Sequence, residues 1–384
     1  GFCTGACSGF AIPVAQKFGA GDYTGMRKFV ANAGWLSAVF AAVMTTIVGL
    51  LCMNILQWMN TPEDIIQGAY DYIFVIFMGI PVTYMYNLLA GIIRSLGDSK
   101  TPVYFLLLSS VLNIGLDFFT ILVLHMGVGG PALATVVSQG ISAVLCLAYM
   151  IHKFPVLRME GDEKKPDRDM IRVLCAMGIP MGLQYSITAI GTMMVQSSLN
   201  ILGSYAVAAF TAGSKIESIF TQAFVAIGTA MSTYNAQNIG ARKLDRVRKG
   251  FRSADVIGCT YGVLVGFILF FVGKYFAYLF ISDNAEVVIP MVETYLQCVG
   301  IFMIPLYVVN SYRNGFQGMG YGLLPMLSGV AELVGRGIMA IVASNKKSYT
   351  MACMASPFAW IIATVLLIGL YFYVMKDMKK KLCL

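Results

Sequence analysis

The chain has 384 residues and a net charge of +8 at pH 7, with 58% hydrophobic and 12% charged residues. That charged share is about half of the share found in soluble domains, and a soluble fold of this length could not bury so many apolar side chains. The composition therefore excludes a soluble protein and predicts an all-α protein that crosses a membrane many times.

The basic residues lie in short segments between apolar stretches, which is typical of cytoplasmic loops and argues against a nucleic-acid partner. The nine cysteines include no Cys-x-x-Cys pair, and the two histidines, His125 and His152, lie near span ends. We interpret the cysteines as packing residues and expect neither a metal site nor another cofactor.

Ten stretches are apolar and long enough to cross a bilayer. In chain order they cover residues 34–59, 70–96, 103–126, 131–152, 171–201, 204–234, 252–282, 288–318, 323–343 and 350–375. Residues 1–15 precede them, and as a helix they would extend about 22 Å, less than a hydrocarbon core of about 30 Å.

An internal repeat relates the two halves of the chain. The numbers of Gln16 and Gln237 differ by 221, and both are followed by similar residues, Lys17-Phe18-Gly19-Ala20 in the first copy and Asn238-Ile239-Gly240-Ala241 in the second. Six predicted spans separate the copies, and an even number returns the chain to the same side of the membrane. The halves are therefore predicted to be parallel repeats, as in some secondary transporters.

The repeat predicts a domain division and a missing beginning. We expect an N-terminal lobe over residues 1–152, a solvated cytoplasmic linker over 153–170 and a C-terminal lobe over 171–384. By the repeat, the first lobe would begin about fifty residues before Gly1. We therefore expect an N-terminally truncated protein of two six-helix lobes that lacks the first of its twelve helices and most of the second.

The loop charges predict the orientation in the membrane. Basic residues mark one side at Lys17, Arg27, Lys28, Arg94, Lys100, segments 152–172 and 242–252, and Lys379–Lys381. The alternate loops carry acidic residues or no charge, except for Lys346 and Lys347. The linker and the C-terminus are therefore expected in the cytoplasm, in a bacterial-type plasma membrane.

Several motifs, in this order, resemble the multidrug and toxic compound extrusion (MATE) family over essentially the whole chain. They are the Gln-x-x-Gly-Ala loops at Gln16 and Gln237, Gly178-Ile179-Pro180, Asn113-Ile114-Gly115-Leu116-Asp117 and the Gly127–Thr135 turn. The resemblance implies a V-shaped pair of lobes that exports cationic or amphipathic compounds in exchange for protons or sodium ions. The major facilitator fold shares the six-plus-six plan, but its Asp-Arg signature is absent from Gly19–Tyr23.

An ionisable side chain at membrane depth marks a functional site by default. Asn113 and Asp117 are four residues apart and share one helix face, and a helical hairpin would bring Thr135 near them. Their oxygen atoms suit a small cation or proton exchange. The family has a coupling-ion site of this pattern, and it adds an acid from the first helix, which lies outside this sequence. The alternative is that Asp117 only bonds to neighbouring helices.

Polar residues in the second lobe are candidates for the substrate cavity. They are Gln184, Thr188, Lys215, Glu217, Tyr307, Asn310 and Asn314. Glu217 would attract a cationic substrate, whereas Lys215 points to the opposite side of the helix. Interhelical hydrogen bonding and ion pairing are the alternative roles for this set.

Two other features of the spans predict structure. Glu332 and Arg336 have the i, i+4 spacing of a self-neutralising structural pair. Pro81 and Pro305 occupy matching places in the two repeats, where each frees a carbonyl and permits a kink. The kinks serve either as bending points or as fixed bends.

The family's sodium-type branch has acids at positions that are Thr188 and about Leu306 or Tyr307 in this sequence, which argues against sodium coupling through the second lobe. The coupling ion, a proton or sodium, stays open. The function predicted is a monomeric ion-coupled antiporter that exports such compounds by alternating access between its lobes. A flippase for lipid-linked saccharides is the alternative, although only Lys215, Arg313 and Arg336 could bind its anionic headgroup. The sequence carries no HExxH, nucleophile elbow or Walker loop, so we do not expect an enzyme.

Overall fold

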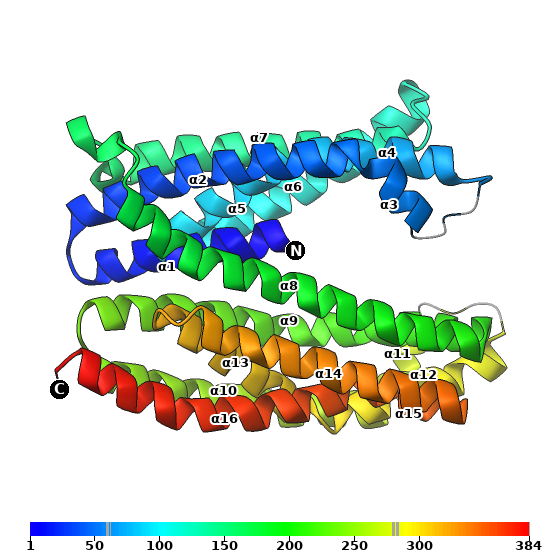
Figure 1. The fold of residues 1–384 in the computed structure, drawn as a ribbon. Coiled ribbons are helices and arrows are strands. Elements are labelled where there is room, and N and C mark those ends of the chain that lie inside the picture. The colour runs from blue at the N-terminus through cyan, green and yellow to red at the C-terminus, as the bar shows by residue number, and fades with distance from the viewer. Residues whose placement is uncertain (59–60, 62, 279–280, 282–283, 384) are drawn as a thin grey trace. The chain divides into compact units, whose positions relative to one another are not determined.

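The computed structural model describes residues 1–58, 61, 63–278, 281 and 284–383, and the regular elements within them are all helices. The predicted all-α class is therefore confirmed. The chain divides into two compact units, Cys3–Ile179 and Gly1–Phe2 with Pro180–Leu384. Each unit is described here by itself (Figure 1).

The first unit holds α1 (Phe2–Gly19), α2 (Tyr23–Leu50), α3 (Cys52–Trp58), α4 (Ile66–Met78), α5 (Ile80–Ser95), α6 (Lys100–Phe118), the π-helical turn η1 (Phe119–Val123), α7 (Gly129–Lys153), and the 3₁₀ turns η2 (Pro155–Leu157) and η3 (Gly161–Lys164). The long helix α8 (Arg168–Leu202) begins in this unit and continues into the second. The second unit adds α9 (Ser204–Gly240), α10 (Leu244–Phe271), α11 (Gly273–Ala277), α12 (Ala285–Gly300), α13 (Met303–Gly318), α14 (Leu323–Lys346), α15 (Tyr349–Cys353) and α16 (Ala355–Lys381).

Among the described residues, seven helical segments are long and apolar enough to cross a membrane, and two bent helix pairs raise the number to nine if each pair is one span. Nine of the ten predicted spans overlap these segments. The exception is the predicted span 204–234, because the long helix α9 there is not among them. Its Ser, Thr, Gly and amide residues, together with Lys215 and Glu217, dilute the apolar character that the prediction assumed.

The internal repeat appears in the helix boundaries. Helix α2 begins at Tyr23 and ends at Leu50, and α10 begins at Leu244 and ends at Phe271, the same offset in numbering that separates Gln16 from Gln237. The ends of α1 and α9 have the same spacing, as have the starts of the short helices α3 and α11. The two Gln-x-x-Gly-Ala motifs thus close equivalent helical hairpins, and each turn contains a residue with positive φ, Gly21 or Arg242.

Both predicted kinks are present. Helices α4 and α5 are bent by 43° where they meet at Gly79, and α12 and α13 are bent by 53° across Ile301 and Phe302. Pro81 and Pro305 lie in the first turn after each break. Proline lacks the N–H that would continue the helix across the break, so the residue type explains the bend.

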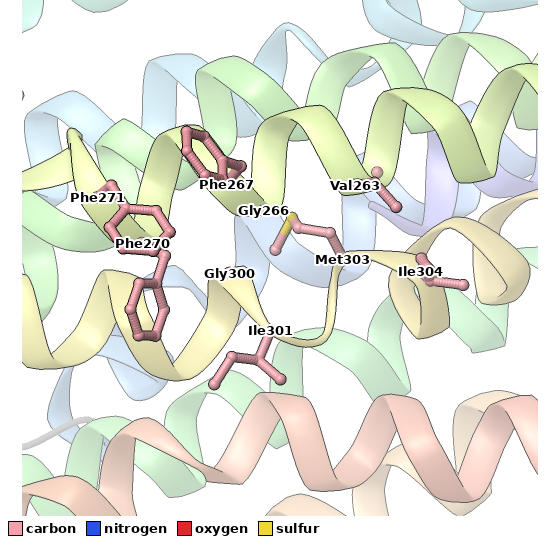
Figure 2. A pocket seen from close by; sticks show the side chains of 10 residues that line it. Val263, Gly266, Phe267, Phe270, Phe271, Gly300, Ile301, Met303 and Ile304 are labelled. Carbon is pink, nitrogen blue, oxygen red and sulfur yellow. The ribbon is translucent and has the colours of Figure 1, made fainter.

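The second bend packs closely against α10. A Cβ atom added at Gly266 would lie 2.5 Å from the carbonyl oxygen of Gly300, so only glycine allows this approach. An apolar pocket of about 400 Å³ opens beside the contact and is lined by Phe267, Ile301 and Met303 among others (Figure 2). The pocket lies against the broken segment, where the backbone departs from regular helix.

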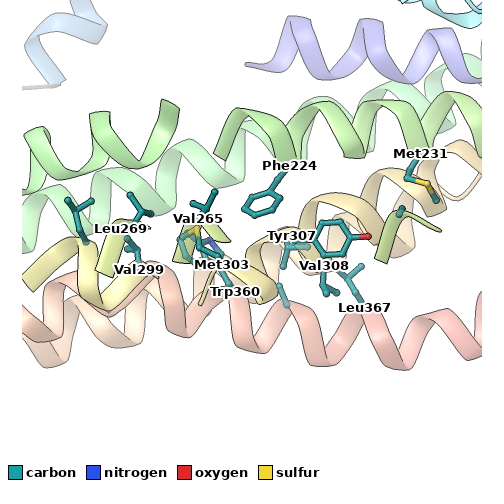
Figure 3. Packing of buried hydrophobic residues seen from close by; sticks show 14 of the residues in the cluster. Phe224, Met231, Val265, Leu269, Val299, Met303, Tyr307, Val308, Trp360 and Leu367 are labelled. Atoms are coloured by element: carbon teal, nitrogen blue, oxygen red, sulfur yellow. The ribbon is translucent and has the colours of Figure 1, made fainter. Parts of the chain in front are cut away.

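The core of the second unit is apolar and aromatic. Phe224, Tyr307 and Trp360 pack there with Leu269 and Val299, from α9, α10, α12, α13 and α16 (Figure 3). Tyr307 fits because its ring lies over Gly258 of α10, where a Cβ atom would be 2.0 Å from a ring carbon. The close approach of these helices depends on such small residues.

Most residues of the linker 153–170 are exposed, but several of them also contact α2. Glu163 of η3 is 8% exposed and forms an ion pair with Arg27 of α2, with an N–O distance of 2.7 Å. The Asn32 side chain accepts a hydrogen bond from the Asp167 amide, and the Trp35 indole donates one to the Lys164 carbonyl. This part of the linker is therefore bound to α2 by an ion pair and two hydrogen bonds.

The ion pair predicts a pH-dependent attachment. The hydrogen bond from the Arg27 guanidinium lowers the pKa of Glu163 from 4.5 to about 2. Because the folded pKa is the lower one, the stabilisation is complete above about pH 4.5 and is lost as the pH falls through about 2. We expect Glu163→Gln to release the segment at neutral pH and to speed tryptic cleavage after Lys164 several-fold.

The matched control is Asp162→Asn. Asp162 forms an ion pair with Lys165, and the exposed fractions of these two side chains are 85% and 75%. Its cleavage rate should equal that of the unmodified protein. Equal cleavage rates for Glu163→Gln and Asp162→Asn would contradict the attachment.

Candidate functional site

The structure brings together the three residues predicted to bind a coupling ion. The Asn113 amide nitrogen lies 3.5 Å from an Asp117 carboxylate oxygen and 3.3 Å from the Thr135 hydroxyl oxygen. Asn113 and Asp117 share a face of α6, and Thr135 lies on α7 after the turn. All three side chains are half-buried. The expected proximity is present, and the ion-binding role stays a prediction.

The local backbone at this cluster is irregular. Helix α6 passes into the π-helical turn η1 directly after Phe118, and the Thr120 hydroxyl donates to the Asp117 carbonyl. The Thr135 hydroxyl donates to the Pro131 carbonyl, so its lone pairs face the Asn113 amide. Single π-turns inside helices often occur at functional sites, because they redirect side chains out of the regular helical pattern.

The Asp117 carboxylate has no salt-bridge partner within the described part of the chain. The carboxylate accepts from the Asn113 amide, whereas the Thr120 hydroxyl donates to the Asp117 main-chain carbonyl. A carboxylate in a membrane span without a basic partner is able to accept a proton or a cation without first breaking an ion pair.

The second unit holds its charges differently. Glu332 and Arg336 form the predicted i, i+4 pair at 3.3 Å, which confirms that prediction. Glu332 also accepts from Arg313 of α13 at 2.8 Å, a contact between helices that the sequence did not reveal. One carboxylate thus bridges two guanidinium groups, and all three residues are buried.

This cluster predicts a large loss of stability when its acid is removed. Glu332→Gln leaves two buried guanidinium groups without their shared counter-charge, and breaking a buried pair costs about 3–5 kcal/mol. We expect a much lower melting temperature for the purified variant. Glu293→Gln is the control, because its pair with Lys274 is partly exposed and such pairs contribute about 0–1 kcal/mol. Similar melting temperatures for the two variants would contradict the role of Glu332.

Two predicted cavity residues lie beside the arginine cluster. Gln184 of α8 is buried and its side-chain oxygen accepts from Gln317 of α13 at 2.7 Å. The Thr188 carbonyl accepts from Arg336, and its hydroxyl donates to the Gln184 carbonyl. Both residues therefore hold helices together in this structure, which is the alternative role considered from the sequence.

Lys215 and Glu217 of α9 have different surroundings. The Glu217 carboxylate accepts a hydrogen bond from the Tyr295 hydroxyl of α12. Lys215 is exposed, and its side chain has neither an ion pair nor a hydrogen bond within the described residues. The two side chains do not pair with each other, as their spacing predicts.

The polar residues of α13 divide between core and helix surface. Tyr307 is fully buried and its hydroxyl donates to Asp255 of α10 at 3.0 Å. The Asn310 and Asn314 amides donate to carbonyls of their own helix, at Leu306 and Asn310, and both are half-buried. Tyr307 therefore packs within the unit instead of facing open space, whereas the two asparagines keep partly accessible side chains.

Sequence reasoning missed Asp255. Its carboxylate accepts hydrogen bonds from both Tyr307 and Tyr312, each at 3.0 Å. Asp255 lies three residues into the predicted span 252–282, next to the basic segment 242–252, and was not considered as a site residue. The sequence could have indicated this site, because Asp255 is an acid within a segment that is long and apolar enough to cross a membrane.

The comparisons with known proteins agree with one another. A sequence profile of the MatE family matches residues 1–119 and 179–342. The chain is 33% identical over 322 residues to the probable multidrug resistance protein YpnP of Bacillus subtilis, which covers 82% of this chain and 69% of that protein. It is 25% identical over 393 residues to the probable multidrug resistance protein YoeA of the same organism, covering 98% and 83%.

Solved structures show the same fold. An outward-facing multidrug resistance MATE family transporter of the MOP superfamily superposes with a TM-score of 0.91 at 20% identity, covering 98% of this chain and 85% of that chain. A crystal structure of MATE in complex with MaL6 gives a TM-score of 0.90 at 20% identity, with 99% and 86% covered. These likenesses concern the fold alone, and the predicted truncation stays a prediction.

Proposed function

Because this chain belongs to the MatE family of membrane transporters, we propose that it exports cationic or amphipathic drugs and toxic compounds in exchange for protons or sodium ions. The names of the relatives YpnP and YoeA, both probable multidrug resistance proteins, support this class of substrate. The proposed transport follows alternating access between two lobes, as the internal repeat suggests.

The arrangement of Asn113, Asp117 and Thr135 is the observation that carries the coupling proposal. Asp117 supplies the negative charge, and it has no salt bridge among the described residues. The Asn113 amide orients the carboxylate and links it to Thr135 on the next helix. A proton or a small cation that binds Asp117 removes the net charge of the cluster and so changes the contacts between α6 and α7.

Substrate recognition is proposed for polar residues of the second unit. Glu217 attracts the positive charge of a substrate, while the half-buried Asn310 and Asn314 provide amide contacts. Lys215 is exposed and limits which cations approach. Gln184, Thr188 and Tyr307 support this surface through their interhelical hydrogen bonds.

The flippase alternative is disfavoured by charge. A pyrophosphate headgroup requires several free basic groups, yet Arg313 and Arg336 both bind Glu332. Lys215 then remains as the one candidate from the predicted set. A single ammonium group is a weak site for a doubly charged headgroup.

Transport in proteoliposomes tests the proposed function. The purified protein is reconstituted with an ethidium-like cation, and a proton gradient or a sodium gradient is applied separately. Movement of the cation against its own gradient under either ion gradient is the expected result. Absence of movement under both, together with translocation of a lipid-linked saccharide, would favour the flippase.

A single substitution tests the coupling site. We expect Asp117→Asn to reduce gradient-driven efflux to the level of empty vesicles, because an amide neither takes up a proton nor balances the charge of a cation. The protein should keep its melting temperature, since no salt bridge is lost. Asp71→Asn is the control, because Asp71 is an exposed acid of α4 in the same unit. Unchanged efflux in Asp117→Asn would remove the coupling role.

A further inference from the structure

The internal repeat reveals a surface that is covered in one unit and open in the other. In the first unit, the start of α8 packs against α1 and α2. A Cβ atom added at Gly9 would lie 2.6 Å from the Cα atom of Gly178, and one added at Gly178 would lie 2.2 Å from the Phe10 ring. The Asn32 amide also contacts the Met170 sulfur, at 3.9 Å. Residues 170–178 therefore cover this side of the first hairpin.

The equivalent surface of the second hairpin is a groove. By the offset of the repeat, Ala6, Gly9, Phe10 and Asn32 correspond to Ile227, Ala230, Met231 and Ser253. All four of these later residues line a groove of about 390 Å³ between α9 and α10, within the second unit. The remaining lining residues are Tyr234, Lys249, Gly250, Ala254 and Ile257.

The groove has a basic end and an apolar end. Lys249 and Ser253 lie one turn apart on α10, and Arg246 precedes them on the same face. Ile257 lies two turns beyond Lys249, about 12 Å along the helix axis. On α9, Ile227, Ala230 and Met231 face the same groove. The occupant that fits such walls is amphipathic, with an anionic group at one end.

The charges support an anionic occupant. In the first unit, the acidic segment before α8 supplies Glu163, which pairs with Arg27. In the second unit, Arg248 pairs with Asp245, but the exposed Lys249 and Arg246 side chains have no ion pair within the described residues. The C-terminal tail is an unsuitable partner because Lys379–Lys381 carry the same sign of charge.

We propose that the groove between α9 and α10 binds an anionic phospholipid. The phosphate group contacts the Lys249 ammonium and the Ser253 hydroxyl, and one acyl chain lies along Ile227, Ala230 and Ile257. Helix α10 is long and apolar enough to cross a membrane, and its basic residues are at its first turns, where lipid headgroups reside. The lipid then takes the place on the second hairpin that α8 takes on the first.

Lipid binding to the purified, delipidated protein tests this proposal. Phosphatidylglycerol, phosphatidylcholine and inorganic phosphate are titrated separately, and binding is followed by native mass spectrometry. We expect phosphatidylglycerol to bind at least several-fold more tightly than phosphatidylcholine. Lys249→Gln should weaken its binding about fivefold, the effect of one basic residue near an anionic membrane surface.

Two further variants separate the charge from the shape of the groove. Lys243→Gln removes the same charge from an exposed residue outside the groove, and binding should change less than twofold. Ala230→Phe fills the apolar part without changing the charge, and Ala230 is exposed, so the fold should be retained while lipid binding falls.

Three results would overturn the proposal. Equal weakening by Lys249→Gln and Lys243→Gln would indicate non-specific attraction, and inorganic phosphate that binds as tightly as the lipid would exclude a role for the acyl chain. If Ala230→Phe changes the oligomeric state in light scattering and leaves lipid binding intact, the groove is instead an interface with a second copy of the chain.

Discussion

Charge inside an apolar helix bundle is the constraint on which this structure depends. An ionised side chain at membrane depth needs a counter-charge or hydrogen bonds, because lipid and packed side chains solvate it poorly. The second unit meets this requirement internally, since Glu332 bridges Arg313 and Arg336, and Asp255 accepts from two tyrosines. The first unit leaves Asp117 with one amide donor and no salt bridge among the described residues. These acids of the second unit therefore have arginine or tyrosine partners, whereas Asp117, in the described part of the first unit, has a single amide donor.

The repeat explains both the likeness and the difference between the units. Equal spacing of the boundaries of α2 and α10 shows that the two hairpins fold from equivalent sequence. The start of α8 covers the first hairpin, whereas among the described residues the equivalent surface of the second hairpin is a groove. Arg27 therefore forms an ion pair with Glu163, whereas its counterpart Arg248 pairs with Asp245 of its own helix. The next residue, Lys249, is exposed and lines the groove. A duplicated scaffold thus presents two chemically different surfaces.

Periodic features of the sequence predicted most of the fold. The spacing of Gln16 and Gln237 revealed the repeat, the prolines revealed both bends, and the i, i+4 spacing placed Asn113 beside Asp117. Whether α9 is a span was harder to predict. The helix is long enough to cross a membrane, but its polar residues lower its apolar character.

Contacts between distant helices could not be predicted in this way. Nothing in the spacing of Arg313 and Glu332 links them, since each lies on its own helix and the pair depends on how α13 meets α14. Tyr307 is predicted to line a cavity because it forms a stripe of polar residues along one helix with Asn310 and Asn314. It is buried because Gly258 on α10 makes room for its ring. A stripe on one helix shows which residues share a face, whereas the neighbouring helix decides whether that face is wet or packed.

The two bends differ in the contacts that hold the helices after them, and this difference bears on the proposed coupling. Helix α13 follows the second bend and is tied to α14 by the Arg313–Glu332 pair and to α10 by Tyr307. Movement at that bend would separate buried charges from their partners, which is costly. Helix α5 follows the first bend and meets α7 through the neutral hydrogen bond from Thr83 to Gln139 at 3.2 Å. Helix α7 also carries Thr135, so an ion bound at the proposed Asp117 site would act on the helix against which the less constrained bend packs.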